Sequence, residues 1–528
     1  MPDTKRQHDM VVWGATGVAG RLVAEFLTEQ YDPDALTLAI GGRNEERLEA
    51  LAADLTVGTE WDDVPILLGD ATDPKSLREL AASTAVVCTT VGPYTTYGTP
   101  LVKACIDART DYCDLTGEVN WIRETVDRFH DAAVEAETRI VHSCGFDSVP
   151  ADIGTALVQS FARETFGVPC EVVRIYLEDG SGGVSGGTLA SFGELFEAAA
   201  EDPVARRTLA NPYSLAPPGE REGVDPGEQR WPRKDPLRDE WTAPSPMAPI
   251  NERIVRRSNA LLGYPWGREF RCLEVVPTGR GLRGAATAGA VAGGLGLFSA
   301  VMSVGPLRSG IRKYVFPDPG EGPTSEETEQ GYFTVRVLGR GTADDDPFTV
   351  EAQFGADWGP GYGATARMLG ETGMCLREDD TDSPLSGGVL TPAAAIGTPR
   401  VEEMVGPEAV QPEAVRPGED LGIDDQRSSR GGRRHGPRRR TGHDPHLHGP
   451  VPAVALQRPE DLADGSAAVG PQGAAASQHE SESRHGSPRV GRLGRARRCS
   501  ARTAGKLAVV PRVGKSDADG ERAGGTSS

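Results

Sequence analysis

Three glycines near the start of the chain have the spacing of a phosphate-binding turn. Gly14, Gly17 and Gly20 follow the apolar run 11–13 and lead into 18–31, where apolar residues recur at helical spacing. In such a turn the first glycine allows the bend, the second lets backbone N–H groups approach a pyrophosphate, and the third lets helix and strand pack closely. The pattern predicts a dinucleotide site whose cofactor-binding residues include Gly14, Ala15, Thr16, Gly17, Val18 and Gly20.

An arginine stands where dinucleotide-binding folds choose between NAD and NADP. Arg43 follows the second predicted strand, 35–40, after a pair of glycines. A carboxylate at this place binds the ribose 2′-hydroxyl of NAD, whereas an arginine accommodates the 2′-phosphate of NADP. The sequence therefore favours NADP, with NAD as the alternative. Arg43 could instead form only a salt bridge with Glu45 or Glu46.

Two further segments end predicted strands at the same edge of the sheet. Asp70 ends the third strand, where it would lie near the adenine ring or serve only as a helix or turn cap. Thr90, Val91 and Gly92 follow the fourth strand and are expected to run beside the ribose and the nicotinamide. Ligands of doubly wound sheets bind outside the carboxyl ends of the strands. We therefore include these four residues in the predicted cofactor site.

Side chains able to transfer a proton beside a hydride donor follow the fourth, fifth and sixth predicted strands. The candidate catalytic residues are Tyr94, Tyr112, His142 and Asp147. His142 could equally be a core histidine, and Asp147 could only cap the helix that begins near Pro150. The chain has no Tyr-x-x-x-Lys pair at the place where a short-chain reductase needs one. The sequence therefore nominates no single proton donor.

Strands that alternate with helices organise the first part of the chain. Six apolar segments alternate with helical ones over residues 1–150, which predicts an α/β Rossmann fold with a doubly wound parallel sheet. Residues 151–360 change pattern and predict a second α/β (α+β) domain that contains an exposed loop at 211–250. Residues 361–397 are expected to form a helical return to the first domain.

The run 285–305 carries no charge over 21 positions. A bilayer span needs about 20 apolar residues, but five glycines and many alanines make this run a poor span. Three interpretations stay open: a buried pair of core helices, a transmembrane anchor, or an apolar hairpin that contacts lipid and admits a long-chain substrate. Positive charge flanks both ends, from Arg280 and Arg283 before the run and from Arg308, Arg312 and Lys313 after it.

Residues 398–528 differ in composition from the rest of the chain. They contain no Phe, Tyr or Trp, whereas the preceding 397 residues hold all 30. Such a segment cannot bury enough apolar surface to offset the entropy of ordering, so we predict a disordered tail. It is either a basic interaction tail or the product of a small coding error that shifts the reading frame. We expect no metal site, either at His443, His446 and His448 or among the eight cysteines, which form no CxxC pair.

The charge balance excludes one class of partner. The chain holds 56 Lys and Arg against 77 Asp and Glu, a formal net charge of −21, and only seven of the basic residues are lysines. This acidic, lysine-poor surface argues against nucleic acid. It resembles the surfaces of proteins from salt-loving organisms, although simple solubility would also explain it. The first ten residues contain no apolar signal segment, so we expect a cytoplasmic protein, peripheral at the membrane if 285–305 contacts lipid.

Many ordered blocks together carry a resemblance to a known family. The blocks GATGVAG, IGGR, GDATD, TTVGPYTTYG, YCDLTGE, HSCGFDSVPADIG and SGGT resemble the saccharopine dehydrogenase-like family, and within it the trans-acting enoyl reductases. FPDPGEGPTSEETEQGYFTVRVLG, GPGYGATARMLGET and SGGVLTPAAAIG resemble the C-terminal blocks of that family. The resemblance covers about residues 8–397. It implies a Rossmann domain completed by C-terminal helices and an intervening α/β domain.

The resemblance also implies an activity. The resemblance implies NADP-linked reduction. In the enoyl reductases the reduced group is a double bond in a lipid or polyketide-type chain, and the resemblance also implies a link to glycolipid synthesis. The small-molecule or lipid-chain substrate and the oligomeric state stay open at this point. The alternative is a non-catalytic member, a nucleotide-binding and lipid-associated scaffold that retains the fold.

Overall fold

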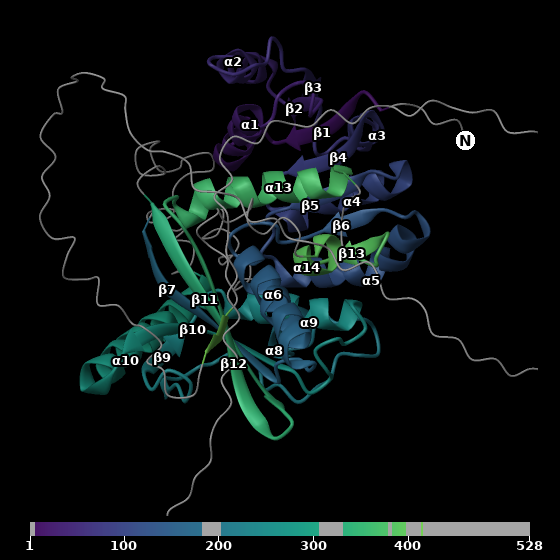
Figure 1. The fold of residues 1–528 in the computed structure, drawn as a ribbon. Helices are drawn as coiled ribbons and strands as arrows, with labels where there is room; N and C mark the ends of the chain where they lie inside the picture. Colours follow the sequence, from purple (N-terminus) through teal and green to yellow (C-terminus); the bar gives the residue numbers. More distant parts are fainter. Residues whose placement is uncertain (1–5, 182–201, 306–330, 379–382, 398–412, 416–528) are drawn as a thin grey trace, which may run out of the picture. The chain divides into compact units, whose positions relative to one another are not determined.

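The first sheet forms from the apolar runs that the sequence marks as strands. The computed structural model describes residues 6–181, 202–305, 331–378, 383–397 and 413–415. All neighbouring strands of the first sheet are parallel, in the order β13-β6-β5-β4-β1-β2-β3 (Figure 1). This confirms the predicted doubly wound sheet. Its strands are β1 (His8–Trp13), β2 (Leu38–Gly42), β3 (Ile66–Leu68), β4 (Thr84–Thr89), β5 (Asp111–Asp114), β6 (Arg139–Val141) and β13 (Gly388–Leu390).

Helices connect these strands, and local side chains explain where several of them begin. The Asn44 side chain accepts a hydrogen bond from the backbone N–H of Arg47, and Asp73 does the same for Lys75, with Pro74 at the first helical position. These helices are α1 (Val18–Gln30), α2 (Glu45–Leu55), α3 (Pro74–Ser83), α4 (Tyr94–Ala108) and α5 (Val119–Glu135).

The C-terminal part of the described chain returns to this first sheet. Residues 361–397 supply most of the π-helix η1 (Pro360–Ala364), α13 (Thr365–Glu378), β13 and α14 (Pro392–Ile396). A Cβ added at Gly370 of α13 would lie 2.9 Å from the Phe26 ring, so α13 packs directly against α1. In Figure 1, β13 and α14 lie beside β6, although about 250 residues separate them in the sequence. The return therefore adds a strand as well as helices.

The second sheet is mixed and has the order β14-β12-β11-β7-β10-β9-β8. Only β7 and β10 pair in parallel, and the helix α6 (Val149–Phe166) packs against β11 and β12, where a Cβ at Gly154 would lie 2.7 Å from the Phe354 ring. Its strands are β7 (Val172–Ser181), β8 (Arg233–Lys234), β9 (Trp241–Pro244), β10 (Arg271–Gly279), β11 (Tyr332–Ala343), β12 (Asp346–Ala356) and β14 (Glu413–Val415).

Residues 211–250 are not the exposed loop that their prolines and charges suggested. They contain β8 and β9, and Leu215 and Ala216 are buried in the core. The buried Asp235 accepts hydrogen bonds from Arg174 (2.6 Å) and from the hydroxyl of Tyr176 (3.0 Å). The expectation was wrong because the polar residues of this segment are paired with partners that lie far away in the sequence.

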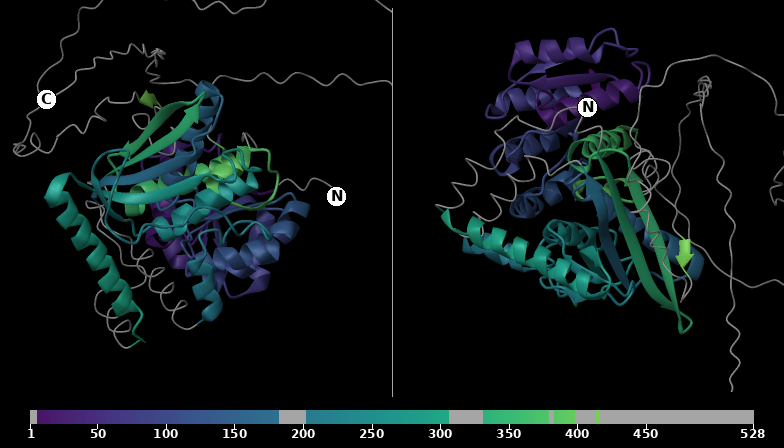
Figure 2. Two further views of the ribbon diagram at one scale, coloured as in Figure 1. Left: turned by 90° about the horizontal axis from the view of Figure 1, so that it is seen from below. Right: turned by 90° about the vertical axis from the view of Figure 1, so that its left-hand side faces the viewer.

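The apolar run 285–305 lies almost entirely within one continuous helix, α10 (Gly281–Met302). Only Gly284, Ala288 and Met302 of this helix are buried, so neither the hairpin nor the buried helix pair describes it. Among the described residues it is the one helix that is long and apolar enough to cross a membrane, by length and composition alone. Figure 2 shows it at the margin of the described part of the chain. Two other helices, α8 (Pro203–Ala210) and α9 (Ala248–Leu261), lie between β7 and β10 in the sequence.

Some predicted features fall outside the described residues. The SGGT block at 185–188 and nearly all of the predicted tail 398–528 belong to this group. The exception in the tail is β14, which pairs with the edge of β12.

Candidate functional site

The predicted phosphate-binding turn connects β1 to α1 in a conformation that requires glycine. Gly14 has φ +90°, and the N–H groups of Gly14 and Ala15 donate to the carbonyl of Gly41 on β2. A Cβ at Gly20 would lie 2.3 Å from the Gly14 carbonyl oxygen, which no side chain can accept. Two of the three glycines are therefore explained by the packing of the turn itself.

The third glycine leaves room at the N-terminus of α1. Gly17 is the N-cap of α1, and no side chain caps it within the described part of the chain. The one atom close to an added Cβ at Gly17 would be the Gly14 carbonyl oxygen, at 3.3 Å. The first turn of the helix carries no acidic residue, so its N–H groups and the positive end of the helix dipole suit a pyrophosphate.

At the tip of β2 the Arg43 guanidinium is exposed. It forms no ion pair with Glu45 or Glu46 in the described residues, and its positive charge lowers the pKa of Asp70 at the tip of β3. The larger cause of that low pKa is Thr72, whose backbone N–H and hydroxyl both donate to the Asp70 carboxylate at 2.8 Å. Asp70 thus forms a turn cap, whereas Arg43 is open to a ligand phosphate.

The segment after β4 lies directly against the phosphate-binding turn. The Thr90 hydroxyl donates to the Gly14 carbonyl at 3.3 Å, and Val91 Cγ2 would lie 2.7 Å from a Cβ at Gly14. Gly92 and Pro93 are joined by a cis peptide bond. The turn and the predicted residues 90–92 are therefore neighbours at the carboxyl edge of the sheet.

Glu118 was not among the predicted site residues, yet its carboxylate caps the first turn of α4 at the carboxyl edge of the sheet. Its carboxylate accepts hydrogen bonds from the backbone N–H groups of Tyr94 (2.9 Å) and Thr95 (2.7 Å) and from the Thr95 hydroxyl. These are orphan donors at the first turn of α4. The sequence signal was weak because the cap comes from 23 residues further along the chain, not from the residue before the helix.

Two of the four candidate proton donors are locked into a buried network. Tyr112 Oη donates to Asp114 Oδ2 at 2.8 Å, and His142 Nδ1 bonds the same oxygen at 2.8 Å. The other ring nitrogen of His142, Nε2, lies 2.9 Å from the Thr125 hydroxyl. All four side chains are buried. The structure therefore favours the core interpretation of His142, and Tyr112 shares its network.

Tyr94 is also satisfied by the protein. Its hydroxyl donates to the Thr89 carbonyl (3.3 Å) and accepts from the Leu115 N–H (3.2 Å), while its ring stacks on Trp121. Burial raises the pKa of its hydroxyl well above the usual value. A buried phenol with both hydrogen-bonding roles filled is poorly placed to reach a substrate.

Asp147 differs from the other three candidates. It lies in the loop between β6 and α6, but Ser148 occupies the N-cap position of α6 and Asp147 makes no hydrogen bond to any described residue. Removal from water raises the pKa of its carboxyl to about 6. Of the predicted catalytic residues, Asp147 is thus the one with a partly exposed and unengaged acid group.

A second carboxyl group, which sequence reasoning missed, lies close to Asp147. Glu274 on β10 accepts from Ser245 Oγ (2.5 Å) and Asn251 Nδ2 (2.6 Å), and Asn251 Oδ1 in turn accepts from Ser148 Oγ (2.8 Å). Burial raises the pKa of Glu274 to about 7, and the negative charge of Asp147 contributes. The loop after β6 is therefore hydrogen-bonded to the second sheet through α9.

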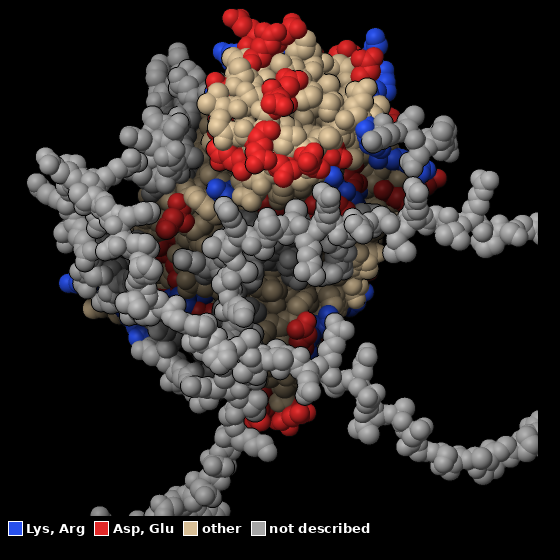
Figure 3. All heavy atoms as spheres, turned by 45° about the horizontal axis from the view of Figure 1, so that its top comes forward, with Lys and Arg blue, Asp and Glu red and all other residues tan. Residues whose placement is uncertain are grey.

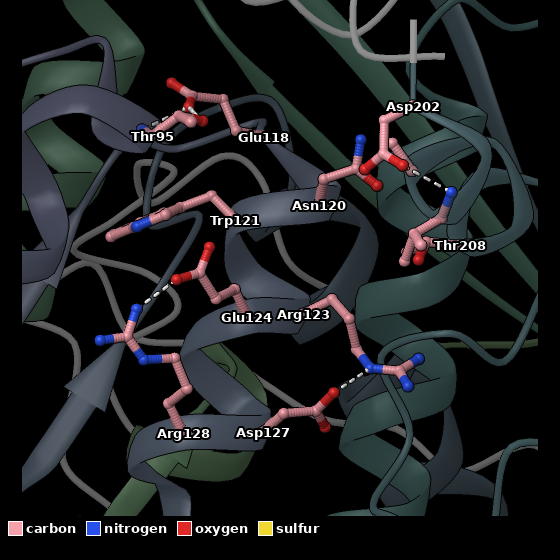
Figure 4. Close-up of a pocket in the computed structure, with 12 residues that line it drawn as sticks. Thr95, Glu118, Asn120, Trp121, Arg123, Glu124, Asp127, Arg128, Asp202 and Thr208 are labelled. Carbon is pink, nitrogen blue, oxygen red and sulfur yellow. Dashed lines mark hydrogen bonds and ion pairs between the residues drawn. The ribbon is translucent and has the colours of Figure 1, made fainter.

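A cavity of about 460 Å³ lies between α5 and α8, outside the phosphate-binding turn. Figure 4 shows Thr95 and Glu118 at one side of it and Asp202 and Thr208 at another. Along α5 its wall carries the ion pairs Arg123–Asp127 (2.7 Å) and Arg128–Glu124. Half of the lining residues are charged, and those on α5 pair with one another, so these charges are compensated within the protein. The described residues contain no group of side chains that could hold a metal ion.

Comparisons with known proteins agree with the geometry of the turn. Residues 10–141 match the family model of the saccharopine dehydrogenase NADP-binding domain. A trans-acting enoyl reductase of Mycobacterium tuberculosis is 41% identical over 413 residues, covering 76% of this chain and 97% of the relative. The trans-acting enoyl reductase of Mycobacterium bovis is 36% identical over 411 residues, covering 75% and 95%. A solved structure of apo saccharopine dehydrogenase (L-Glu forming) from Saccharomyces cerevisiae gives a TM-score of 0.45 at 12% identity, over 78% of this chain and all of that one.

Proposed function

Because this chain belongs to the saccharopine dehydrogenase-like family of NADP-dependent oxidoreductases, with the trans-acting enoyl reductases as relatives, we propose that it reduces a carbon–carbon double bond in a lipid or polyketide-type chain. The observation that carries the proposal is the open N-terminus of α1 together with the unpaired Arg43 at the tip of β2. These features fit NADP, and the relatives' printed names supply the reaction class. The wider setting we propose is glycolipid metabolism.

NADPH supplies the hydride in such a reduction, and the residues of this chain bind and orient it. The N–H groups at Gly17 and the first turn of α1 would hold the pyrophosphate, and Arg43 would bind the 2′-phosphate bidentately. The nicotinamide half would then lie over the ends of β4 and β5, beside Thr90–Gly92. Binding at this edge positions the hydride next to the loops that carry the remaining chemistry.

We further propose that the protein is cytoplasmic and contacts a membrane surface through α10. Two features support this: Leu282 and Leu297 of α10 are exposed large apolar side chains, and the run from Gly284 to Met302 is uncharged. A helix that lies in the interface would bring the enzyme to long-chain substrates. The acidic composition is in keeping with a concentrated-salt environment, and Figure 3 shows many acidic side chains on the face of the described part that it draws.

A specific observation favours a second candidate, the non-catalytic scaffold. Tyr94, Tyr112 and His142 are satisfied by protein partners, so three of the four expected proton donors are not open to a substrate. A scaffold would bind NADPH tightly and never oxidise it. A reductase would oxidise it in proportion to an added enoyl substrate.

One assay distinguishes the reductase from the non-catalytic scaffold. Purified full-length protein is mixed with NADPH and trans-2-hexadecenoyl-CoA, and NADPH absorbance and the saturated product are followed together. We expect stoichiometric loss of NADPH and gain of hexadecanoyl-CoA, with hexadecanoyl-CoA itself as the inert control. Tight NADPH binding without oxidation, across enoyl thioesters of several chain lengths, would reject the reductase in favour of the scaffold.

A further inference from the structure

The loop after β6 lies on the nicotinamide side of the first sheet. The sheet order is β6-β5-β4-β1-β2, with Arg43 at the tip of β2 and Asp147 in the loop that follows β6. Strands are spaced by about 4.8 Å, so the end of β6 lies about 10 Å past the end of β4. β5 lies within this interval, so a substrate next to a nicotinamide at Thr90–Gly92 would lie over the end of β5. Asp147 therefore borders the space in which the reacting double bond would lie.

The neighbours of Asp147 hold its loop in place without engaging its carboxyl group. The Phe146 N–H donates to Thr365 Oγ1 at 3.2 Å, and the Phe146 ring packs edge-to-face on Phe333 at 4.7 Å. On the other side, Ser148 Oγ donates to Asn251 at 2.8 Å. Both residues adjacent to Asp147 are fixed, whereas its own carboxyl has no partner in the described residues. A fixed backbone with a free acid group suits a proton donor.

The protonation state of this group is suited to donation. Desolvation raises the pKa of Asp147 to about 6, so an appreciable fraction of the carboxyl carries a proton near neutral pH. Glu274, on β10, is the acidic neighbour that the structure records, and the negative charge of Asp147 helps to raise the pKa of Glu274, after the larger effect of burial. Of the four candidates from the sequence, Tyr94, Tyr112 and His142 each have their polar atoms bonded to protein.

We propose that Asp147 is the proton donor of the reduction. This inference rests on the proposed function. Bound NADPH would supply a hydride to the β-carbon of the enoyl thioester and would leave as NADP⁺, while the electron pair of the double bond would move to the α-carbon and the thioester oxygen. Asp147 then transfers its proton to the α-carbon, which forms the second C–H bond. The resulting carboxylate regains a proton from water, which balances the cycle.

The test uses the full chain with NADPH and trans-2-hexadecenoyl-CoA, and compares the wild type with Asp147→Asn, Asp147→Glu and a matched control. Asp346→Asn is that control, because Asp346 is an exposed carboxylate on β12, remote from the loop. We expect Asp147→Asn to lower kcat by about 10²- to 10⁴-fold, the usual contribution of a general acid, while the Kd for NADPH stays within about twofold. Asp147→Glu should restore part of the rate, and Asp346→Asn should match the wild type.

Two results would overturn the assignment. Asp147→Asn with a wild-type kcat shows that another group supplies the proton, although the reductase proposal would stand. If the wild type shows no turnover, the reductase proposal fails, and the carboxyl titration decides the fate of Asp147. That titration uses ¹³C-carboxyl NMR of the NADP⁺ complex, with Asp147→Asn identifying the signal. A carboxyl that titrates near the ordinary value of about 3.9 would reject Asp147 as an acid.

Discussion

Asp114 organises the residues at the ends of β5 and β6. Its Oδ2 bonds Tyr112 Oη and His142 Nδ1, and its Oδ1 accepts from the N–H groups of Thr116 (3.0 Å) and Ser143 (3.1 Å). A buried carboxylate with four partners fixes the geometry of two strand ends at once. The network thus fixes the ends of β5 and β6, and the chemistry must come from side chains that are not hydrogen-bonded within it.

Replacing the Asp114 carboxylate should lower the free energy of unfolding more than replacing any one of its hydrogen-bond partners. In Asp114→Asn an amide N–H₂ group must face groups that donate, so we expect a loss of about 3 kcal/mol in the free energy of unfolding. Tyr112→Phe removes one hydrogen bond and should cost about 1 kcal/mol. Denaturant unfolding of both variants measures the difference. Equal small losses would mean that the network contributes little to stability.

Arg43 is expected to set cofactor preference. Its guanidinium is exposed and unpaired within the described residues, so a 2′-phosphate can bind it without breaking an existing contact. Arg43→Asp should weaken NADPH binding by about 1.5–3 kcal/mol and weaken NADH binding much less. Fluorescence titration with the two cofactors gives both dissociation constants. Equal losses for NADPH and NADH would contradict the assignment.

Two glycines of the same turn should respond differently to the same change. Gly17→Val places a side chain where the pyrophosphate approaches, and its Cβ would have only the Gly14 carbonyl oxygen nearby, at 3.3 Å, so the fold should survive and cofactor binding should be lost. Gly20→Val meets the Gly14 carbonyl at 2.3 Å and should lower the melting temperature by several degrees or more. Thermal melts and NADPH titration separate these effects. Intact NADPH binding in Gly17→Val would place the cradle elsewhere.

At the scale of elements, the sequence predicted the first sheet well because its strands are apolar runs next to glycine-rich turns. It did not predict β13, because Gly388–Leu390 is only three residues long and gains its partner β6 from far away in the chain. The helix α9 was hidden for another reason. Arg256 is buried because it bonds both Asp225 and Glu252 at 2.8 Å, which no local pattern reveals. The missed Glu274 belongs to the same tertiary arrangement.

The helix α10 carries the prediction for membrane contact. Leu282 and Leu297 are 90% and 67% exposed, so replacing them should not disturb the core. We expect the wild type to float with vesicles that contain anionic phospholipid, and Leu282→Asp with Leu297→Asp to remain in solution while binding NADPH normally. Val57→Asp, at a residue that is 79% exposed outside α10, is the matched control. Flotation of the double variant with the wild type would contradict lipid contact through α10.

At the scale of the whole molecule, composition separates a part of the chain that can build a core from a part that cannot. All 30 aromatic residues precede residue 398. The curated relative from Mycobacterium tuberculosis is matched over 97% of its length by 76% of this chain, so about a quarter of the chain has no counterpart in that alignment. The catalytic and cofactor-binding residues proposed here all lie before residue 398. The remainder is therefore not expected to contribute to the chemistry.

Two truncated chains test this expectation, one that keeps β14 and one that lacks it. Glu413–Val415 pairs with Thr349–Glu351 at the edge of β12, so a chain ending after Val415 keeps this strand and one ending after Gly397 loses it. We expect the first truncation to leave the melting temperature and the Kd for NADPH unchanged, because residues 416–528 have too few large apolar side chains to offset their ordering entropy. The second should lower the melting temperature by a few degrees at most, since it removes one three-residue edge strand. A large loss of stability or of NADPH affinity in the longer truncated chain would show that the tail packs against the oxidoreductase fold.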